Sequence, residues 1–187
     1  MEKKREHTKN ILADCFKQLI LKGNFDKITI KMITDEAGVI RPTFYNYFQD
    51  KYEVIEWLLE QEVFNEAIGL LEEGKEKEAI ESLFVKMDKD RNYYQKVFEV
   101  TGQNGFEEIL TRNIKEFIQT LFEKHSFKLE EYPDLFSEKV FVEFQAVTIV
   151  SGIKLWMTNK TRQLDANEAM EFYMFLMSHS IMEIINM

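Results

Sequence analysis

The sequence predicts an all-α protein, in which a small N-terminal three-helix helix-turn-helix domain precedes a larger helical domain. Apolar residues recur with helical spacing along most of the 187 residues. The chain holds only seven glycines and two prolines, which leaves few places for turns. No segment alternates between apolar and polar residues for long enough to predict a strand.

The first helix is expected from about Thr8 to Lys22. Thr8 is expected to cap its start, and Gly23 to end it in the left-handed conformation. The lone Cys15 lies on the apolar stripe of this helix, so it is expected to pack in the core rather than to react, and it excludes an intrachain disulfide. The stripe comprises Ile11, Leu12, Cys15, Phe16, Leu19 and Ile20.

A helix-turn-helix pattern follows. Thr29 is placed to cap a short helix that Gly38 ends. A small residue, a glycine and a branched apolar residue then stand in a row at 37–39 (AGV), which lets two short helices pack closely through a tight turn. The next segment, VIRPTFYNYFQDK at 39–51, contains the second of these helices, with Phe44 and Phe48 directed into the core.

Asp50 begins a longer helix, and Glu53 three residues later suggests a capping box. Gly69 and Gly74 mark its end. The sequence therefore divides into a helix-turn-helix domain at 1–52, with the start of a connecting helix at 50–72, and a helical domain at 53–187.

The larger domain is predicted to hold helices at 76–88, 89–101, 106–124, 137–159 and 166–186. A GQNG loop separates the second and third, and a polar stretch with Pro133 separates the third and fourth. Asp165 and Glu168 form a second capping-box pair before the last helix.

The charge of the chain is unevenly distributed. The net charge is −9, but residues 1–52 carry ten Lys and Arg against seven Asp and Glu, a net of +3, and the remainder carries −12. Such asymmetry favours a nucleic-acid-facing N-terminal end. With no apolar run of the length of a membrane span and no signal peptide, a cytoplasmic location without membrane contact is expected.

Catalytic and metal-binding patterns are not found. His7, His125 and His179 are far apart and have no ligand partners at helical spacing, so no metal site is expected. There is no phosphate-binding loop and no nucleophile motif. We therefore expect neither enzymatic activity nor a cofactor.

The segment KITIKMITDEAGVIRPTFYNYFQDKYEVIEWLL resembles the N-terminal domain of the TetR family of bacterial transcription regulators. The elements of the resemblance are Thr29, the AGV turn, the segment TFYNYF at 43–48 and Lys51. It covers about residues 8–60. The resemblance implies that the larger domain binds a ligand and forms a homodimer.

The resemblance also implies which residues contact double-stranded DNA. Arg41, Pro42, Thr43 and Asn46, joined by Lys31, occupy positions that face base edges. Tyr45, Tyr47, Lys51 and Thr29 occupy positions that hold backbone phosphates. Read without the family, the two tyrosines are ordinary surface residues. Ile40 departs from the family, where a small polar cap is common, and this departure leaves open that the segment contacts a protein.

For the larger domain the resemblance implies two further sets of residues. A pocket for an unknown small-molecule effector is expected from Tyr93, Tyr94, Phe98, Gln103, Asn104, Phe117, Phe144, Gln145 and Trp156. A homodimer interface is expected from Phe141, Phe144, Thr148, Ser151, Tyr173, Leu176 and Met177. Two copies would place their recognition helices about 34–36 Å apart on a palindromic operator.

Two functions follow. The first is a homodimeric, ligand-responsive transcriptional regulator, a repressor released from a palindromic operator by a small molecule. The alternative is an activator or coactivator of the same fold that is controlled through a protein partner. The segment VTGQNGF at 100–106 is loosely similar to family activators that sense the dihydroxyacetone kinase system through such a partner.

Overall fold

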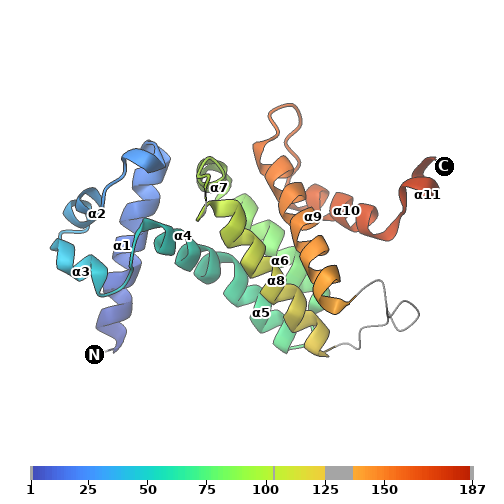
Figure 1. Ribbon diagram of the computed structural model, residues 1–187, viewed down its shortest axis with the longest axis horizontal. Coiled ribbons are helices and arrows are strands. Elements are labelled where there is room, and N and C mark those ends of the chain that lie inside the picture. Colours follow the sequence, from blue (N-terminus) through green and yellow to red (C-terminus); the bar gives the residue numbers. More distant parts are fainter. Residues whose placement is uncertain (1, 103, 125–136, 186–187) are drawn as a thin grey trace. The chain divides into compact units, whose positions relative to one another are not determined.

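The computed structural model describes residues 2–102, 104–124 and 137–185 (Figure 1). Every regular element within these ranges is a helix, which confirms the predicted all-α class. The chain forms two compact units. Unit 1 comprises residues 1–62 and 91–110, and unit 2 comprises residues 63–90 and 111–187. The division of domains at residues 52 and 53 stays a prediction.

Unit 1 is built around the long helix α1 (Glu2–Lys22), which packs against α2 (Ile30–Glu36), α4 (Lys51–Leu59) and α7 (Arg91–Val97), while α2 also packs against α3 (Arg41–Tyr45). Thr8 lies inside α1, so its predicted role as a cap is wrong. The apolar stripe of α1 does face the core. The side chains that are at most 2% exposed include Leu12, Phe16, Ile20, Ile33, Phe44, Phe48, Ile55 and Leu58.

Two glycines of unit 1, Gly38 and Gly23, were predicted to end helices, and the prediction is confirmed only for Gly38. Gly38 has φ of +66°, and the N–H of Val39 bonds to the carbonyl of Thr34 at 3.0 Å, which closes α2 as expected. Gly23 does not adopt a positive φ, so that prediction is wrong. The chain instead enters the short 3₁₀ helix η1 (Phe25–Lys27) at once, because Asn24 caps it by accepting the N–H of Asp26 at 2.8 Å.

The predicted helix at 50–72 is present with one irregularity. Asp50 caps α4 by accepting the N–H groups of Tyr52 and Glu53 at 2.8 and 3.0 Å. The Glu53 carboxylate accepts the N–H of Gln49 rather than that of Asp50, so the capping box is displaced by one residue. The helix then passes through a π-helical turn, η2 (Glu60–Phe64), into α5 (Asn65–Glu72), and Gly74 follows with φ of +74°. The boundary between the two units falls within η2.

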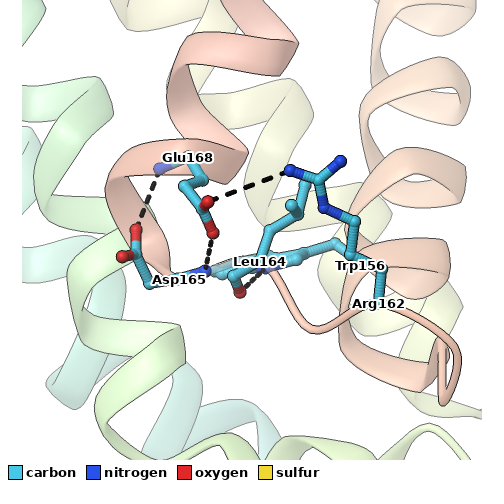
Figure 2. Close-up of polar contacts among 5 residues, drawn as sticks. All are labelled: Trp156, Arg162, Leu164, Asp165 and Glu168. Carbon is cyan, nitrogen blue, oxygen red and sulfur yellow. Dashed lines mark hydrogen bonds and ion pairs between the residues drawn. The ribbon is translucent and has the colours of Figure 1, made fainter.

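Unit 2 contains α5, α6 (Glu76–Lys89), most of α8 (Phe106–Lys124), α9 (Glu138–Thr158), α10 (Ala166–Ser178) and α11 (Ile181–Ile185). Helix α6 packs against both α5 and α10. Asp165 and Glu168 form the predicted capping box at the start of α10 (Figure 2). The N–H of Ala166 also donates to the Asp88 carboxylate at 3.1 Å, which ties this end of α10 to α6.

The prediction of one helix at 166–186 is wrong, because the chain breaks between α10 and α11. Ser180 starts α11 with its own capping box. Its hydroxyl accepts the N–H of Glu183 at 3.2 Å, and its N–H donates to the Glu183 carboxylate at 2.6 Å. The sequence signal for this break, Ser-x-x-Glu at 180–183, lies inside an apolar stretch that reads as continuous helix.

Helix α9 is long and apolar enough to cross a membrane by length and composition, although a third of its most apolar window is buried inside unit 2. The core helices of soluble proteins also meet this criterion. The expectation concerned unbroken apolar runs, and α9 is interrupted by Glu143 and Lys154, so this one helix is weak evidence for a membrane span.

Candidate nucleic-acid interface

Helix α3 has a buried face and an exposed face. Phe44 and Phe48 are 0% and 1% exposed, and their ring centroids lie 5.6 Å apart, so both serve the core as the sequence predicts. The exposed face carries most of the side chains predicted to contact bases and phosphates. Arg41, Pro42, Tyr45 and Asn46 are exposed, and Thr43 and Tyr47 are half-buried.

Arg41 and Tyr45 form a pair along the exposed face of α3. The guanidinium Nη2 donates to the Tyr45 hydroxyl at 2.9 Å, and the guanidinium carbon lies 5.6 Å from the tyrosine ring centroid. Spacing of four residues on a helix brings such side chains together. The pair therefore orients a planar group with several unused donors on an exposed surface.

The other predicted contacts come from α2 and its cap. The Thr29 hydroxyl oxygen accepts the N–H of Met32 at 3.2 Å, which confirms its capping role, and Thr29 remains exposed. Lys31 is also exposed. Met32 of α2 is an apolar side chain that is 41% exposed, and it was not among the residues predicted to contact DNA.

Lys51, which was predicted to bind a DNA phosphate, makes contacts within the protein. Its ammonium group donates to the carbonyls of Phe25 and Ile28 at 2.7 and 3.1 Å and lies 4.0 Å from the Phe25 ring centroid. Partial burial lowers the pKa of Lys51, and the nearby Asp26 carboxylate opposes that shift. An ammonium group has three donors, so these contacts commit most of its capacity to the end of η1.

Ile40 occupies the N-cap position of α3 without a side-chain hydrogen bond, as the sequence indicates. Its side chain is 71% exposed. The Ile40 carbonyl still accepts the N–H of Thr43 at 2.9 Å, and Pro42 in the first turn removes one N–H that would need a partner.

The residues predicted to form the effector pocket are divided between the two units, and the pocket that they were expected to form stays a prediction. Phe117 and Trp156 line apolar cavities in unit 2, but Tyr93, Tyr94 and Phe98 are buried in unit 1. Phe144 and Asn104 are exposed, Gln145 is half-buried, and Gln103 lies outside the described residues. Helix α6 supplies residues to the cavity that were not predicted, at helical spacing, namely Ile80, Leu83, Phe84 and Met87. The helical spacing of these four residues can be recognised in the sequence, but the cavity that they line cannot be predicted from it.

The predicted dimer residues divide into two groups. Phe141 is half-buried and lies 5.8 Å from Phe122 between ring centroids, and Tyr173 lies 5.7 Å from Phe84. These two face other helices of unit 2. The exposed group comprises Phe144, Thr148, Ser151, Leu176 and Met177.

The described residues offer no support for metal binding or for a nucleophilic thiol. Within the residues described, no three His, Cys, Asp or Glu side chains gather as a metal site would require. The half-buried thiol of Cys15 has a pKa raised by burial and by the carboxylates of Glu36 and Asp14. A raised pKa opposes the thiolate form that a nucleophile needs.

Comparison with known proteins agrees with this arrangement. Residues 17–58 match the family model for bacterial regulatory proteins of the tetR family. The chain is 33% identical over 100 residues to the HTH-type dhaKLM operon transcriptional activator DhaS of Lactococcus lactis subsp. lactis (strain IL1403), and the match spans 52% of each chain.

A solved structure, the dihydroxyacetone kinase operon activator DhaS, has the same fold with a TM-score of 0.60 and 21% identity, covering 91% of this chain and 92% of that one. The matched family is one of regulators rather than enzymes. The family model covers α2 and α3 together with the turn at Gly38, which are the elements that expose the candidate interface. Residues 17–58 thus carry the N-terminal domain of the tetR family of bacterial regulatory proteins.

Proposed function

We propose that this protein is a homodimeric transcriptional regulator that binds double-stranded DNA through the exposed face of α3. The observation that carries the proposal is the set of outward side chains on α3, in which a guanidinium, a phenol and an amide stand on a helix held by Phe44 and Phe48. Arginine and asparagine are side chains that read base edges in the major groove. Such a regulator acts in the cytoplasm, where bacterial DNA lies.

The dimer is supported by the apolar surface of α9 to α11. Many large apolar side chains of these helices are exposed. Isolated apolar residues are normal on a protein surface, but a group of them indicates an interaction site. The predicted residues Phe144, Leu176 and Met177 belong to this surface at 72%, 43% and 42% exposure. A second copy related by a two-fold axis would cover it and would set two α3 helices on a palindromic site.

The direction of regulation has two candidates. A repressor that a small molecule releases from its operator is the direction that the family resemblance suggests. Activation is favoured by the similar proteins, because both carry the word activator in their names. Control through a protein partner is the alternative to a small-molecule effector in either case.

The test measures, by fluorescence anisotropy at several salt concentrations, how the purified protein binds the DNA upstream of its own gene. We expect a sequence-dependent affinity that falls steeply with salt, because phosphate contacts release counterions. A folded protein that shows no preference for any nearby palindrome would overturn the proposal. A reporter fused to the same promoter then separates the two directions, since deletion of the gene raises expression for a repressor and lowers it for an activator.

A further inference from the structure

Ile40 directly precedes α3, at a position where most helices have a side-chain hydrogen-bond acceptor. Its backbone is extended, with φ of −83° and ψ of 151°, and its side chain makes no hydrogen bond to the first turn. Isoleucine is among the least favourable residues at this position, because it offers no acceptor. Its side chain is 71% exposed, compared with 39% for Leu21 and 41% for Met32 in the same unit. Ile40 therefore leaves α3 without a cap and also places an apolar group in water.

Contacts within the protein do not account for an isoleucine at this position, since most of its side chain meets solvent. An apolar residue that fixes how the chain enters a helix stands one position earlier, where the half-buried Val39 lies. Phe44 and Phe48 already occupy the buried side of α3. Residues that break a local rule without a gain in folding are expected at functional sites. Ile40 is therefore a candidate contact for a binding partner.

The exposed groups near Ile40 on α3 are mostly polar. Arg41 follows it directly, and the Arg41 guanidinium donates to the Tyr45 hydroxyl at 2.9 Å. Asn46 is exposed at the other end of α3. A protein partner would be expected to meet a contiguous apolar patch, whereas α3 and its cap expose the aliphatic groups of Ile40 and Pro42 among hydrogen-bonding groups. This mixture fits the edge of a base pair, where polar atoms surround a single methyl group.

The C5-methyl of thymine is the apolar group that base pairs present in the major groove. An isoleucine side chain neither donates nor accepts hydrogen bonds, so it cannot distinguish the polar atoms of the base edges. Its branch at Cβ restricts rotation about χ1, so it loses little freedom when a contact fixes it. The chemistry of Ile40 thus selects the methyl group among the features of the groove.

We propose that Ile40 contacts the C5-methyl group of one thymine in each half-site of the operator, and that this contact makes the protein select thymine there. The inference rests on the DNA-binding function proposed above. It adds a residue that the family resemblance does not assign to DNA. The contact removes apolar surface of the isoleucine and of the methyl group from water. Loss of one buried methyl group corresponds to an affinity lower by about three- to fivefold.

Uracil substitution tests this contact, because uracil pairs as thymine does and lacks only the methyl group. The probe is the fluorescent operator duplex identified by the binding test above, with each thymine in turn replaced by uracil. For the wild type, uracil at one thymine per half-site is expected to weaken binding by about three- to fivefold. Pro42 and Thr43 also carry carbon groups at positions predicted to face bases, so variants of Ile40 are needed to assign the effect.

Ile40→Ala and Ile40→Ser identify the residue that makes the contact. At the thymine that Ile40 contacts, both variants are expected to bind the thymine and uracil duplexes equally, while the effects of uracil elsewhere stay as in the wild type. Ile40→Ser is expected to fold at least as stably as the wild type, because serine supplies the missing acceptor. A lost preference for thymine in that variant therefore does not come from unfolding. Leu21→Ala is the matched control, since it shortens another exposed aliphatic side chain, in α1, and should keep the wild-type uracil profile.

Three outcomes would overturn the inference. If both Ile40 variants keep the full uracil profile of the wild type, another residue contacts the methyl group, and Ile40 is left to face a protein partner. If no uracil substitution weakens binding by the wild type, no thymine methyl group is recognised. In these two cases the DNA-binding function still stands. If the folded protein prefers no DNA sequence, the inference and the proposed function both fail.

Discussion

The ammonium group of Lys51 lies 4.0 Å from the ring centroid of Phe25 and donates a 2.7 Å hydrogen bond to the Phe25 carbonyl. The first residue of α4 is thereby joined to η1, which follows α1. The position resembles a phosphate clamp in the family pattern. In this protein the same side chain also holds two segments of unit 1 together.

Lys51→Ala is accordingly expected to lower both stability and DNA affinity. Loss of two carbonyl contacts and the contact with the ring should reduce the free energy of unfolding by about 1–2 kcal/mol. Urea denaturation measures this. Lys31→Ala is the control, because Lys31 is exposed and should change DNA affinity alone. If Lys51→Ala unfolds at the wild-type urea concentration, the structural role is wrong.

Arg41 and Tyr45 should have separable effects on DNA. Arg41→Ala is expected to weaken binding and relax sequence preference, because a bidentate base contact contributes about 1–3 kcal/mol of discrimination. Tyr45→Phe removes the hydrogen bond that orients the guanidinium but keeps the ring, so we expect a loss of roughly 2–10-fold with the preference retained. Anisotropy on a set of single-base operator variants measures both. A flat specificity profile in wild type and Arg41→Ala alike would contradict the base-reading role.

Ile40→Ser should stabilise α3. Serine can accept the N–H groups of the first turn that isoleucine leaves without a side-chain acceptor, and Ile40 is 71% exposed, so little apolar burial is lost. The expected gain is about 0.5–1 kcal/mol in the free energy of unfolding. Ile40→Ala shortens the same side chain without providing an acceptor and should not give the gain. Equal stability of the two variants would exclude capping as the cause.

Tyr173 should make stability fall with pH in the alkaline range. Burial raises the pKa of Tyr173 in the folded protein. Above about pH 10 the unfolded chain loses this proton while the folded chain keeps it, so stability decreases by up to about 1.4 kcal/mol per pH unit until the folded pKa is reached. Tyr173→Phe should remove this contribution. Denaturation of both proteins from pH 8.5 to 11 tests it, and parallel pH profiles would contradict it.

Phe144→Glu should prevent association of two copies. Phe144 is 72% exposed on α9, and a carboxylate at the centre of an apolar interface would be buried without a partner. Sedimentation should show a monomer, and binding to a palindromic operator should weaken. Val85→Glu places the same charge on α6, at a side chain that is 45% exposed, and should leave association intact. If the Phe144→Glu protein is still a dimer, Phe144 does not lie in the dimer interface.

Local patterns were sufficient for the elements of unit 1. Thr29, Gly38 and Asp50 each act through neighbours within a few residues, so their roles as caps and turn can be inferred from spacing alone. Phe44 and Phe48 follow the same logic, since positions four apart on a helix share a face. The failures of local prediction were also local. Asn24 caps η1, a 3₁₀ turn that the sequence did not predict after Gly23, and Ser180 caps α11 inside a stretch where the apolar pattern suggests one longer helix.

The sequence by itself determined the helical class, the helix-turn-helix and the two-faced character of α3. Only the tertiary structure decided that Lys51 contacts Phe25, that Tyr93 belongs to unit 1 and that Phe84, Trp156 and Tyr173 surround a cavity. The physical reason is the range of the interactions. Caps and turns are closed by residues a few positions apart, whereas a cavity is the space left where side chains from α6, α8, α9 and α10 fail to meet, and no single segment encodes that space.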